Sequence, residues 1–572
     1  MKLKSRRINK YNVTLMLIFL AISILTFFPV MRLGKIFVYN DGVFHLQRLN
    51  EVYLNLKSCS PTFIASHTFG KMGIASFEFY PSVFLYPWAL LRFIYKPVTA
   101  FYVGYIVIFF VTMVVSYFTM LSYSKGDRVR SIAFALIYGF AGKHITEFMK
   151  FQIGEVIAYT FIPIAFLGFY KLMLTSEKKQ GGRLLAIGLA LIAYSHVLSL
   201  YLTVTTMAFI FIVLFLLKKI DIRTFLVCVK SAILFLLLVG WQLMPFIEND
   251  FRHKVSTPNF LFHVDPIEFL WHNSWHNIFD DASLGLVISI SLVFGWIVIN
   301  NQIEKWIYVV GVFTTMAATN LFPWEIVKRT GLYNLVTPLQ NSFRFLIVSV
   351  FFLCITASLL LTRIIRIKKY GIILTVVLFL GFLFSYKESL EGYYSVISNN
   401  QATNVVRSQK DKQLPMFMVI NNTEYDKMNN YLSPSGSTDY ITKLAAKDNN
   451  YKNIKNDHLL INGKVKSKVR FSDKNRIVFI FEAKKGDKID IPVMKYNRTR
   501  IEVNGKIVKS QESKRGTVEF MLSSSGRQKV SVYYHPSVLD GLLFIGAIFI
   551  WVIILNTSLS QKLNYLVTKS FW

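Results

Sequence analysis

Apolar runs of helix length alternate with short basic clusters along most of the chain. The runs cover residues 11–31, 98–121, 131–145, 154–174, 184–217, 225–247, 284–299, 306–319, 345–361, 372–385 and 539–555. Residues 184–217 are too many for one span and are predicted to form two short helices around Ser199. Since about twenty apolar residues cross the hydrocarbon core of a bilayer, the pattern predicts about twelve membrane-spanning helices.

A long polar stretch, residues 387–537, precedes the last apolar run. Its later part alternates apolar and polar positions in short segments, among them NRIVFIFEA, RTRIEVNGKIV and QKVSVYYH. The pair Asn504-Gly505 between two such segments is typical of a β-hairpin turn. Residues 388–458 are rich in Asn, Ser and Lys and are predicted to be largely irregular. We therefore predict an all-α polytopic membrane domain (1–386), an inserted β-rich, sandwich-like domain (387–537), and a final span with its tail (538–572).

The basic residues predict how the chain is oriented in the membrane. The N-terminus reads MKLKSRRINK, and further Lys and Arg clusters occupy alternate loops at 125–130, 178–183, 218–223 and 363–369. The first apolar run is longer than the core of a signal peptide and lacks a small-residue cleavage site, so an uncleaved helix is expected. By the positive-inside rule both termini are cytoplasmic, and the loops 32–97, 248–283 and 320–343 lie outside together with the β-rich domain.

Composition and charge narrow the class of protein further. Of the 572 residues, 53% are hydrophobic and only 17% are charged, whereas soluble proteins carry about 25% charged residues. The net charge of +32 includes an excess in the β-rich domain, which favours anionic partners such as lipid headgroups or wall polymers, and nucleic acid is excluded because these charges lie beyond the membrane. The three cysteines, Cys59, Cys228 and Cys354, all lie outside the β-rich domain. A disulfide-free outer domain is typical of a Gram-positive-type bacterium rather than of a eukaryotic secreted protein.

The first outer loop opens with the richest candidate site, NDGVFHLQRL. If this segment is helical, Asp41, His45 and Arg48 share one face at spacings i, i+4 and i+7. A carboxylate at that position could deprotonate an acceptor hydroxyl, and the arginine could pair with it or hold a phosphate. The spacing alone equally fits an amphipathic helix that lies on the bilayer surface.

Further candidates lie near the outer ends of the spans. The stretch GKHITEFMKFQIGE carries Lys143, His144, Glu147 and Glu155. Glu155 is placed either to satisfy a helix N-terminus or to face the same cavity as Asp41. His196 lies inside an apolar run, where an ionisable residue indicates either function or a neutral imidazole hydrogen-bonded within the bundle.

Two outer loops carry the remaining candidates. His272 and His276 have the i, i+4 spacing of two metal ligands, but without an HExxH context we predict a polar, substrate-facing loop and no metal site. Gln340 and Arg344 lie at the mouth of the tenth span, where an arginine either binds a lipid phosphate or anchors the helix by snorkelling. No Gly-rich nucleotide loop, Walker motif or Ser/His/Asp arrangement occurs, so no cofactor is predicted, and energy would come from an activated lipid donor or a gradient.

The chain resembles the GT-C superfamily of membrane glycosyltransferases. Within it, the chain is most similar to YfhO-type bacterial membrane proteins and to the related group labelled 6-pyruvoyl-tetrahydropterin-synthase-related. The resemblance covers nearly the whole chain and is carried by NDGVFHLQRL, FEFYPSVFLYPWALL, GEVIAYTFIPIAFLGFYKL, AYSHVLS, LQNSFRF and RIEVNGKIVKSQ. It implies a polyprenyl-phosphate sugar donor, a cell-envelope acceptor such as teichoic acid, and Asp41 as the base or acceptor-binding carboxylate. The family often has an acidic pair there, whereas this chain has Asn40 before Asp41.

These observations together predict an inverting sugar transfer at the outer membrane face. Asp41 would activate the acceptor hydroxyl, Arg344 and Arg48 would hold the lipid phosphate, and Glu155 or His144 would orient substrate. The remaining substrate-binding candidates are His45, His196 and Gln340. Two rival functions stay open. One is a transporter or flippase of a lipid-linked precursor, which would need inverted repeats or broken helices, and the other is a non-catalytic scaffold that presents the β-rich domain.

Overall fold

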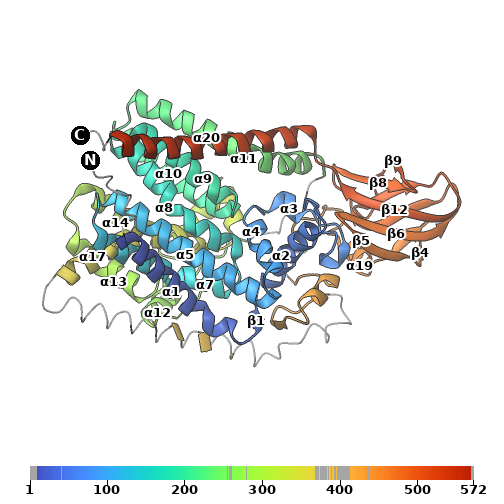
Figure 1. Ribbon diagram of the computed structural model, residues 1–572, viewed down its shortest axis with the longest axis horizontal. Coiled ribbons are helices and arrows are strands. Elements are labelled where there is room, and N and C mark those ends of the chain that lie inside the picture. The colour runs from blue at the N-terminus through green and yellow to red at the C-terminus, as the bar shows by residue number, and fades with distance from the viewer. Residues whose placement is uncertain are drawn as a thin grey trace, which may run out of the picture.

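The computed structural model describes residues 10–39, 41–253, 255–256, 261–278, 280–366, 413–434 and 438–568, with scattered positions between 373 and 395. The predicted span 372–385 therefore falls mostly outside the described residues. Figure 1 shows the long helices running along the long axis of the molecule, with the strands of the C-terminal part gathered at one end.

Seven helices in the described part are long and apolar enough to cross a bilayer. They lie in α1 (Lys10–Met31), α5 (Pro97–Tyr123), α8 (Ile153–Leu174), α10 (Val197–Leu216), α11 (Ile222–His253), α17 (Leu346–Arg366) and α20 (Val538–Thr568). This is compatible with a membrane protein. Residues 184–217 fall in two helices, α9 and α10, but the break lies at residues 194–196 rather than at Ser199, which belongs to α10.

Twelve spans are not confirmed, because several predicted spans form short helices. These are α6 (Arg128–Gly139), α9 (Lys178–Ala193), α13 (Leu286–Phe294) and α14 (Gln302–Ala317), with 9 to 16 residues each. A straight crossing takes about twenty residues. The other short helices are α7 (Gly142–Met149), α12 (Ile267–Trp275), η3 (Gly295–Val298), α15 (Trp324–Lys328), α16 (Tyr333–Val336), η4 (Thr337–Leu339) and η5 (Ser342–Phe345).

The helical bundle is built around α8. This helix packs against α5 and α9, and α17 packs against α6, α13 and α14. A Cβ atom on Gly168 would lie 2.3 Å from the backbone nitrogen of Leu185, and one on Gly188 would lie 2.5 Å from that of Ala165. Helices α8 and α9 therefore touch along their backbones, an approach that small residues permit between membrane helices.

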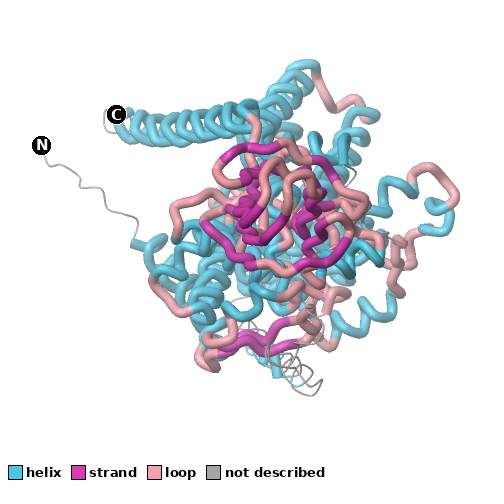
Figure 2. Tube along the Cα trace, turned by 90° about the vertical axis from the view of Figure 1, so that its right-hand side faces the viewer, coloured by secondary structure: helices cyan, strands magenta, loops and turns pink. Residues whose placement is uncertain are grey.

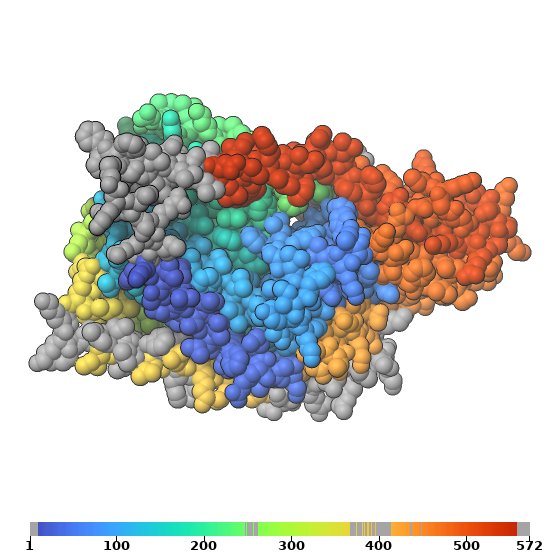
Figure 3. Space-filling model, viewed as in Figure 1, coloured from blue at the N-terminus to red at the C-terminus, as the bar shows by residue number. Residues whose placement is uncertain are grey.

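Residues 32–97 form a layer between the bundle and the strands. The layer holds β1 (Lys35–Val38), α2 (Gly42–Lys57), η1 (Phe69–Lys71), α3 (Ser76–Phe79), α4 (Leu85–Leu90) and η2 (Leu91–Phe93). Strand β1 pairs with β2 (Met418–Asn421) in antiparallel register, which brings residues 413–434 and η7 (Asp426–Asn430) to the same layer. Figure 3 shows the layer in blue adjoining residues 413–434 and the strands, both in orange.

Helix α2 is buried on almost all sides, although its sequence is polar. Most residues from Gly42 to Val52 are buried. Polar faces are paired with neighbouring segments: Gln47 donates hydrogen bonds to the carbonyl oxygens of Met428 (2.7 Å) and Tyr431 (2.8 Å). The alternative of an amphipathic helix lying on the bilayer surface is therefore wrong.

The β-rich part is a sandwich of two five-stranded sheets, ordered β10-β11-β7-β3-β4 and β5-β6-β12-β8-β9. Figure 2 looks onto it with the bundle behind. Asn504 and Gly505 have φ of 48° and 83°, as the predicted hairpin turn between β8 and β9 requires. The first strand of the sandwich is β3, which follows α19 (Asp448–Lys455), so the strands do not begin at residue 387. The strands are β3 (Leu459–Ile461), β4 (Lys464–Lys466), β5 (Val469–Asp473), β6 (Arg476–Ala483), β7 (Lys488–Met494), β8 (Thr499–Val503), β9 (Lys506–Val508), β10 (Gln511–Glu512), β11 (Thr517–Met521) and β12 (Gly526–Tyr534).

The sandwich is docked on both the layer and the bundle. The Met494 amide donates to the Met72 carbonyl oxygen (3.0 Å), which extends β7 onto the layer. Arg498 donates two hydrogen bonds, of 3.0 and 2.8 Å, to the carboxylate of Glu248 in α11. The layer is thereby enclosed between the sandwich and the ends of the long helices.

Candidate functional site

Four side chains from separate elements meet at the N-terminal end of α8. The carboxylate oxygens of Glu155, in the first turn of α8, lie 4.0 Å from Lys143 Nζ, 4.0 Å from His196 Nδ1 and 3.9 Å from Arg344 Nε. Lys143 belongs to α7, His196 precedes α10, and Arg344 belongs to η5. Since a helix N-terminus also stabilises a carboxylate, this end of α8 is a strongly polar centre among apolar helices.

Lys143 holds the centre of this charged cluster. Its Nζ atom lies 3.7 Å from Glu147 and 3.7 Å from Asp281. The side chain is nearly fully buried, with 2% exposed. Burial alone would lower the pKa of the ammonium group, but the carboxylates of Asp281 and Glu147 outweigh it and the pKa of Lys143 is raised. Lys143 therefore remains charged inside the protein.

The pKa values of the acids around Lys143 are shifted in opposite directions. Burial raises the pKa of the Glu147 carboxyl well above its ordinary value and outweighs the attraction of Lys143. Burial also opposes ionisation of Asp281, but Lys143 and Lys150 outweigh it and the pKa of Asp281 is lowered. The pKa values of two acids that share Lys143 are thus shifted in opposite directions, as in sites where one acid donates and another accepts a proton.

The ion pairs of the cluster are loose. Separations of 3.7 to 4.0 Å exceed the roughly 2.8 Å of a charge-assisted hydrogen bond. Two buried atoms, Nη1 of Arg344 and Oδ1 of Asp281, accept or donate no hydrogen bond within the described ranges. Because buried polar groups are nearly always paired, this geometry suits a polar ligand or ordered water between the charges.

Residues 280–285 are held against α7 and supply Asp281. Lys150 Nζ lies 2.5 Å from Asp280 and 2.7 Å from Asp281. A Cβ atom on Gly142 would lie 2.8 Å from the backbone nitrogen of Gly285, so glycine alone permits this approach. Lys150 and Asp281 were not among the predicted site residues, and the adjacent acids Asp280 and Asp281 were the only signal for them.

Gln340 and Arg344 contact each other just before α17. Arg344 donates from Nη2 to Oε1 of Gln340 at 2.9 Å. The guanidinium side chain is 22% exposed, so it is reachable from outside the cluster. A guanidinium with one amide partner and a spare edge suits a phosphate, as the sequence predicts for this position.

Tyr80 lies near both Glu155 and Asp41. Its ring centroid is 5.9 Å from that of His196, and a Cβ atom on Gly154 would lie 2.3 Å from its hydroxyl oxygen. Burial raises the pKa of Tyr80, and the charges of Glu155 and Asp41 both act on it in the same direction. Both carboxylates are therefore near one phenol, although they are far apart in the sequence.

Asp41 is half-buried at the N-terminal end of α2. Burial, and after it the charge of Asp41, raise the pKa of Asp439 to about 6. The two carboxyl groups therefore lie near each other. Burial raises the pKa of Tyr440, and the charge of Asp41 contributes in the same direction. A second acid therefore approaches Asp41 from a distant segment, whereas no second acid precedes it in the sequence.

Arg48 and His45 face the interior of the layer. Arg48 is 1% exposed, donates to the carbonyl oxygens of Tyr80 (3.0 Å) and Pro81 (2.8 Å), and lies 4.4 Å from the Tyr80 ring centroid. His45 packs on the same ring at 5.6 Å, and burial followed by the charge of Arg48 lowers its pKa well below the ordinary value. These contacts position Tyr80 and leave the guanidinium occupied by backbone rather than facing Glu155.

His144 and His196 are both neutral. His144 stacks on Tyr159 at 4.1 Å, its Nδ1 is 2.8 Å from the Gly139 carbonyl oxygen, and burial lowers its pKa to about 3. Burial also lowers the pKa of His196 to about 4, against the opposing effect of Glu155. The backbone amide of Ser199 donates to Nδ1 of His196 at 3.3 Å, so the imidazole caps α10. His144 is thus a packing residue, and only His196 reaches the cluster.

His272 and His276 remain apart from these charges. Their ring centroids are 4.4 Å apart, and Nδ1 of His276 is bonded to the His272 carbonyl oxygen (2.9 Å). Within the described ranges, no group of three or more His, Cys, Asp or Glu side chains is arranged to hold a metal ion.

The predicted residues thus fall into two groups. Glu155, His196, Arg344 and Gln340 lie at the cluster, and Asp41 lies near Tyr80, whereas His45, Arg48 and His144 are packed in the interior. Tyr80, Tyr440 and Asp439 were not predicted, because no local pattern marks them.

Comparisons with known proteins add no relative to this geometry. No family model, no curated protein and no solved structure matches the chain.

Proposed function

We propose that the protein is a membrane glycosyltransferase that moves a sugar from a polyprenyl-phosphate donor to an acceptor of the cell envelope. The observation that carries the proposal is that Tyr80 lies near two carboxylates, Asp41 and Glu155, with Arg344 and Lys143 beside the second. Cations for a phosphate and a carboxylate for a hydroxyl are the two requirements of such a transfer. Both lie where the long helices meet the layer that carries the sandwich.

The reaction would be a single displacement at the anomeric carbon of the sugar. The Asp41 carboxylate accepts the proton of the acceptor hydroxyl as the new carbon–oxygen bond forms. The bond between the anomeric carbon and the phosphate oxygen breaks, and its electron pair leaves on the lipid phosphate, which Arg344 and Lys143 stabilise. Glu155 orients these cations through its contacts of 3.9 and 4.0 Å.

The orientation of the chain follows from its basic end. The Arg128 guanidinium lies over the Tyr11 ring at 4.6 Å, and Arg366 pairs with Asp127 at 2.8 Å, so the start of α1 and the ends of α5 and α17 share one end of the bundle. By the positive-inside rule this end is cytoplasmic. The charged cluster, the layer and the sandwich would then face the outside of a Gram-positive-type cell, where envelope polymers are found.

Replacing Asp41 tests the proposal directly. Purified protein in liposomes would be given a radiolabelled polyprenyl-phosphate sugar and a wall-polymer acceptor. We expect Asp41→Asn to lower sugar transfer by about 10²- to 10⁴-fold, the usual contribution of a general base, while the melting temperature stays near that of the wild type. Asp473→Asn, on an exposed position of β5, is the matched control. Normal transfer by a folded Asp41→Asn protein would refute the assignment.

A flippase of a lipid-linked precursor is the second candidate, because a buried charged cluster at the break between α9 and α10 also suits a transport path. Lipid scrambling by purified protein without sugar transfer would favour it. A scaffold that only presents the sandwich would instead tolerate replacement of Asp41, Glu155 and Arg344 together, and would lose function when residues 388–537 are deleted.

A further inference from the structure

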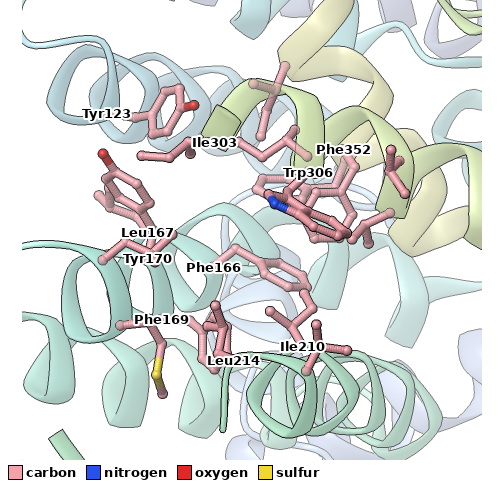
Figure 4. A pocket seen from close by; sticks show the side chains of 18 of the residues that line it. Tyr123, Phe166, Leu167, Phe169, Tyr170, Ile210, Leu214, Ile303, Trp306 and Phe352 are labelled. Atoms are coloured by element: carbon pink, nitrogen blue, oxygen red, sulfur yellow. The ribbon is translucent and has the colours of Figure 1, made fainter. Parts of the chain in front are cut away.

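A second chemically distinct feature lies nearer the basic end of the bundle. It is a cavity of about 710 Å³ between α5, α8, α10, α14 and α17, shown in Figure 4. Pro163 and Leu174 are its first and last lining residues in α8. At 1.5 Å per residue they lie about 12 and 29 Å along the helix from Glu155, so the cavity is separate from the charged cluster.

The lining of the cavity is almost wholly aromatic and aliphatic. Its inner wall consists of buried side chains such as Phe134, Phe166 and Phe352. Apolar cavities of this kind do not retain water and bind apolar guests. Inside a bilayer, the apolar guest at hand is a hydrocarbon chain.

Helices α10 and α14 supply one wall of the cavity. Phe209 of α10 and Phe313 of α14 stack with ring centroids 5.5 Å apart and an interplanar angle of 3°, which joins the two helices near their middle. Below this contact, towards the basic end, Leu214 and Trp306 line the cavity from opposite sides (Figure 4). Phe209 and Phe313 are 50% and 40% exposed, so this wall of the cavity adjoins the outer surface of the bundle.

The basic end of the cavity carries groups that suit a lipid headgroup. Lys219 lines it, together with the hydroxyl-bearing rings of Tyr123 and Tyr170. Asp221, two residues further on, pairs with Lys178 at 3.0 Å. Lysine and tyrosine at the end of an apolar span are placed at the level of lipid phosphates.

We propose that this cavity binds the acyl chains of an anionic membrane phospholipid, which enters between α10 and α14 and places its phosphate at Lys219. The chains would make dispersion contacts with the aromatic walls, and the ammonium group would select a net negative headgroup over a zwitterionic one. This lipid site lies in the half of the bilayer opposite the charged cluster and does not depend on the glycosyltransferase proposal.

The test counts the lipids that stay bound to the purified protein. The full chain would be placed in nanodiscs of equal phosphatidylglycerol and phosphatidylcholine, and native mass spectrometry after release would count retained lipid. We expect one phosphatidylglycerol to be retained preferentially. Val310→Trp, which fills the cavity, should lower retention about tenfold or more. Leu216→Trp, at a 72% exposed position of α10, is the matched control and should retain lipid normally.

A charge variant separates headgroup recognition from folding. Lys219→Gln should lower the preference for phosphatidylglycerol over phosphatidylcholine by about fivefold, the effect of one lysine at a membrane surface, while Lys218→Gln, which does not line the cavity, leaves it unchanged. Equal retention of both lipids by the wild type, or unchanged retention by Val310→Trp, would overturn the proposal. Retention of polyprenyl phosphate instead of phosphatidylglycerol from mixed nanodiscs would overturn it as well.

Discussion

Glu51 and Glu155 are two acidic residues buried in helices, yet their surroundings differ. Glu51, in α2, accepts hydrogen bonds from the backbone amides of residues 66–68 and from the hydroxyls of Ser66 and Thr68, at 2.7 to 3.1 Å. Glu155, in α8, has its positively charged neighbours Lys143 and Arg344 only at 4.0 and 3.9 Å.

The difference separates a structural acid from one available to a ligand. A carboxylate with short bonds to several donors cannot accept a further partner without losing one, so Glu51 fixes the loop that supports the sandwich. Charges separated by about 4 Å are only partly neutralised by each other, so they can still bind a charged ligand. The first environment stabilises the fold, and the second suits chemistry.

Removing the carboxylate of Glu51 should have the largest effect on stability. In Glu51→Gln the new NH₂ group would face the N–H and O–H donors of residues 66–68, so neither side could accept a hydrogen bond. We expect a loss of about 3–5 kcal/mol of folding free energy, seen as a lower melting temperature and less folded protein in detergent. Glu482→Gln, at an exposed position of β6, is the control. A melting temperature equal to that of the control would show that the bonds of Glu51 are not structural.

Removing the charge of Arg344 should affect catalysis more than folding. Arg344→Gln deletes a cation that we propose binds the donor phosphate and whose nearest carboxylate is 3.9 Å away. We expect sugar transfer to fall about a hundredfold with a melting temperature close to that of the wild type. Arg329→Gln, exposed in the same outer region, is the control. A large loss of stability without a specific loss of transfer would place Arg344 with Glu51 rather than with Glu155.

The sequence predicts the elements better than it predicts the site. Apolar runs and the alternating segments indicate the long helices and the sandwich because each reflects one local periodicity. The span count fails at short helices such as α6 and α13, since hydropathy measures apolarity and not where a helix ends. The sequence also gives no sign that β2 (Met418–Asn421) pairs with β1, because the two strands are far apart in the sequence.

The site is predicted only where charge itself is unusual. Glu155 and Arg344 stand out because ionisable residues beside apolar runs are rare. Tyr80 and Asp439 carry no such signal, since their importance comes from packing between distant segments. Arg48 carries a misleading one: its spacing from Asp41 suggests a shared face, whereas its guanidinium is turned to the carbonyl oxygens of residues 80–81.

A smaller effect should follow from displacing Tyr80. In Gly154→Ala the new methyl group would lie 2.3 Å from the Tyr80 hydroxyl oxygen and 3.0 Å from the Ser195 carbonyl oxygen. We expect a loss of about 1–3 kcal/mol from overpacking and a matching loss of sugar transfer. Tyr80→Phe removes the clashing oxygen, so the double variant should recover part of the stability, but not all, because the Ser195 contact stays. Strictly additive losses in this double-mutant cycle would show that the two residues do not contact each other.

The smallest effect is expected at Glu78, an acid intermediate between the two compared above. It is half-buried, and burial first, then the nearby charge of Asp540, raises its pKa to about 8. Since the unfolded value is about 4.3, the unfolded chain loses this proton first, and stability falls as the pH rises from about 4.5 to 8. Glu78→Gln removes that dependence.

Because solvent screens a half-buried group, we expect the melting temperature of the wild type to fall relative to the variant by only about 1–2 °C between pH 5 and 8. Parallel melting curves across this range, with Glu482→Gln as the control, would mean that Glu78 ionises as freely in the folded protein as in the unfolded chain, and that an acid beside Asp540 is tolerated without cost.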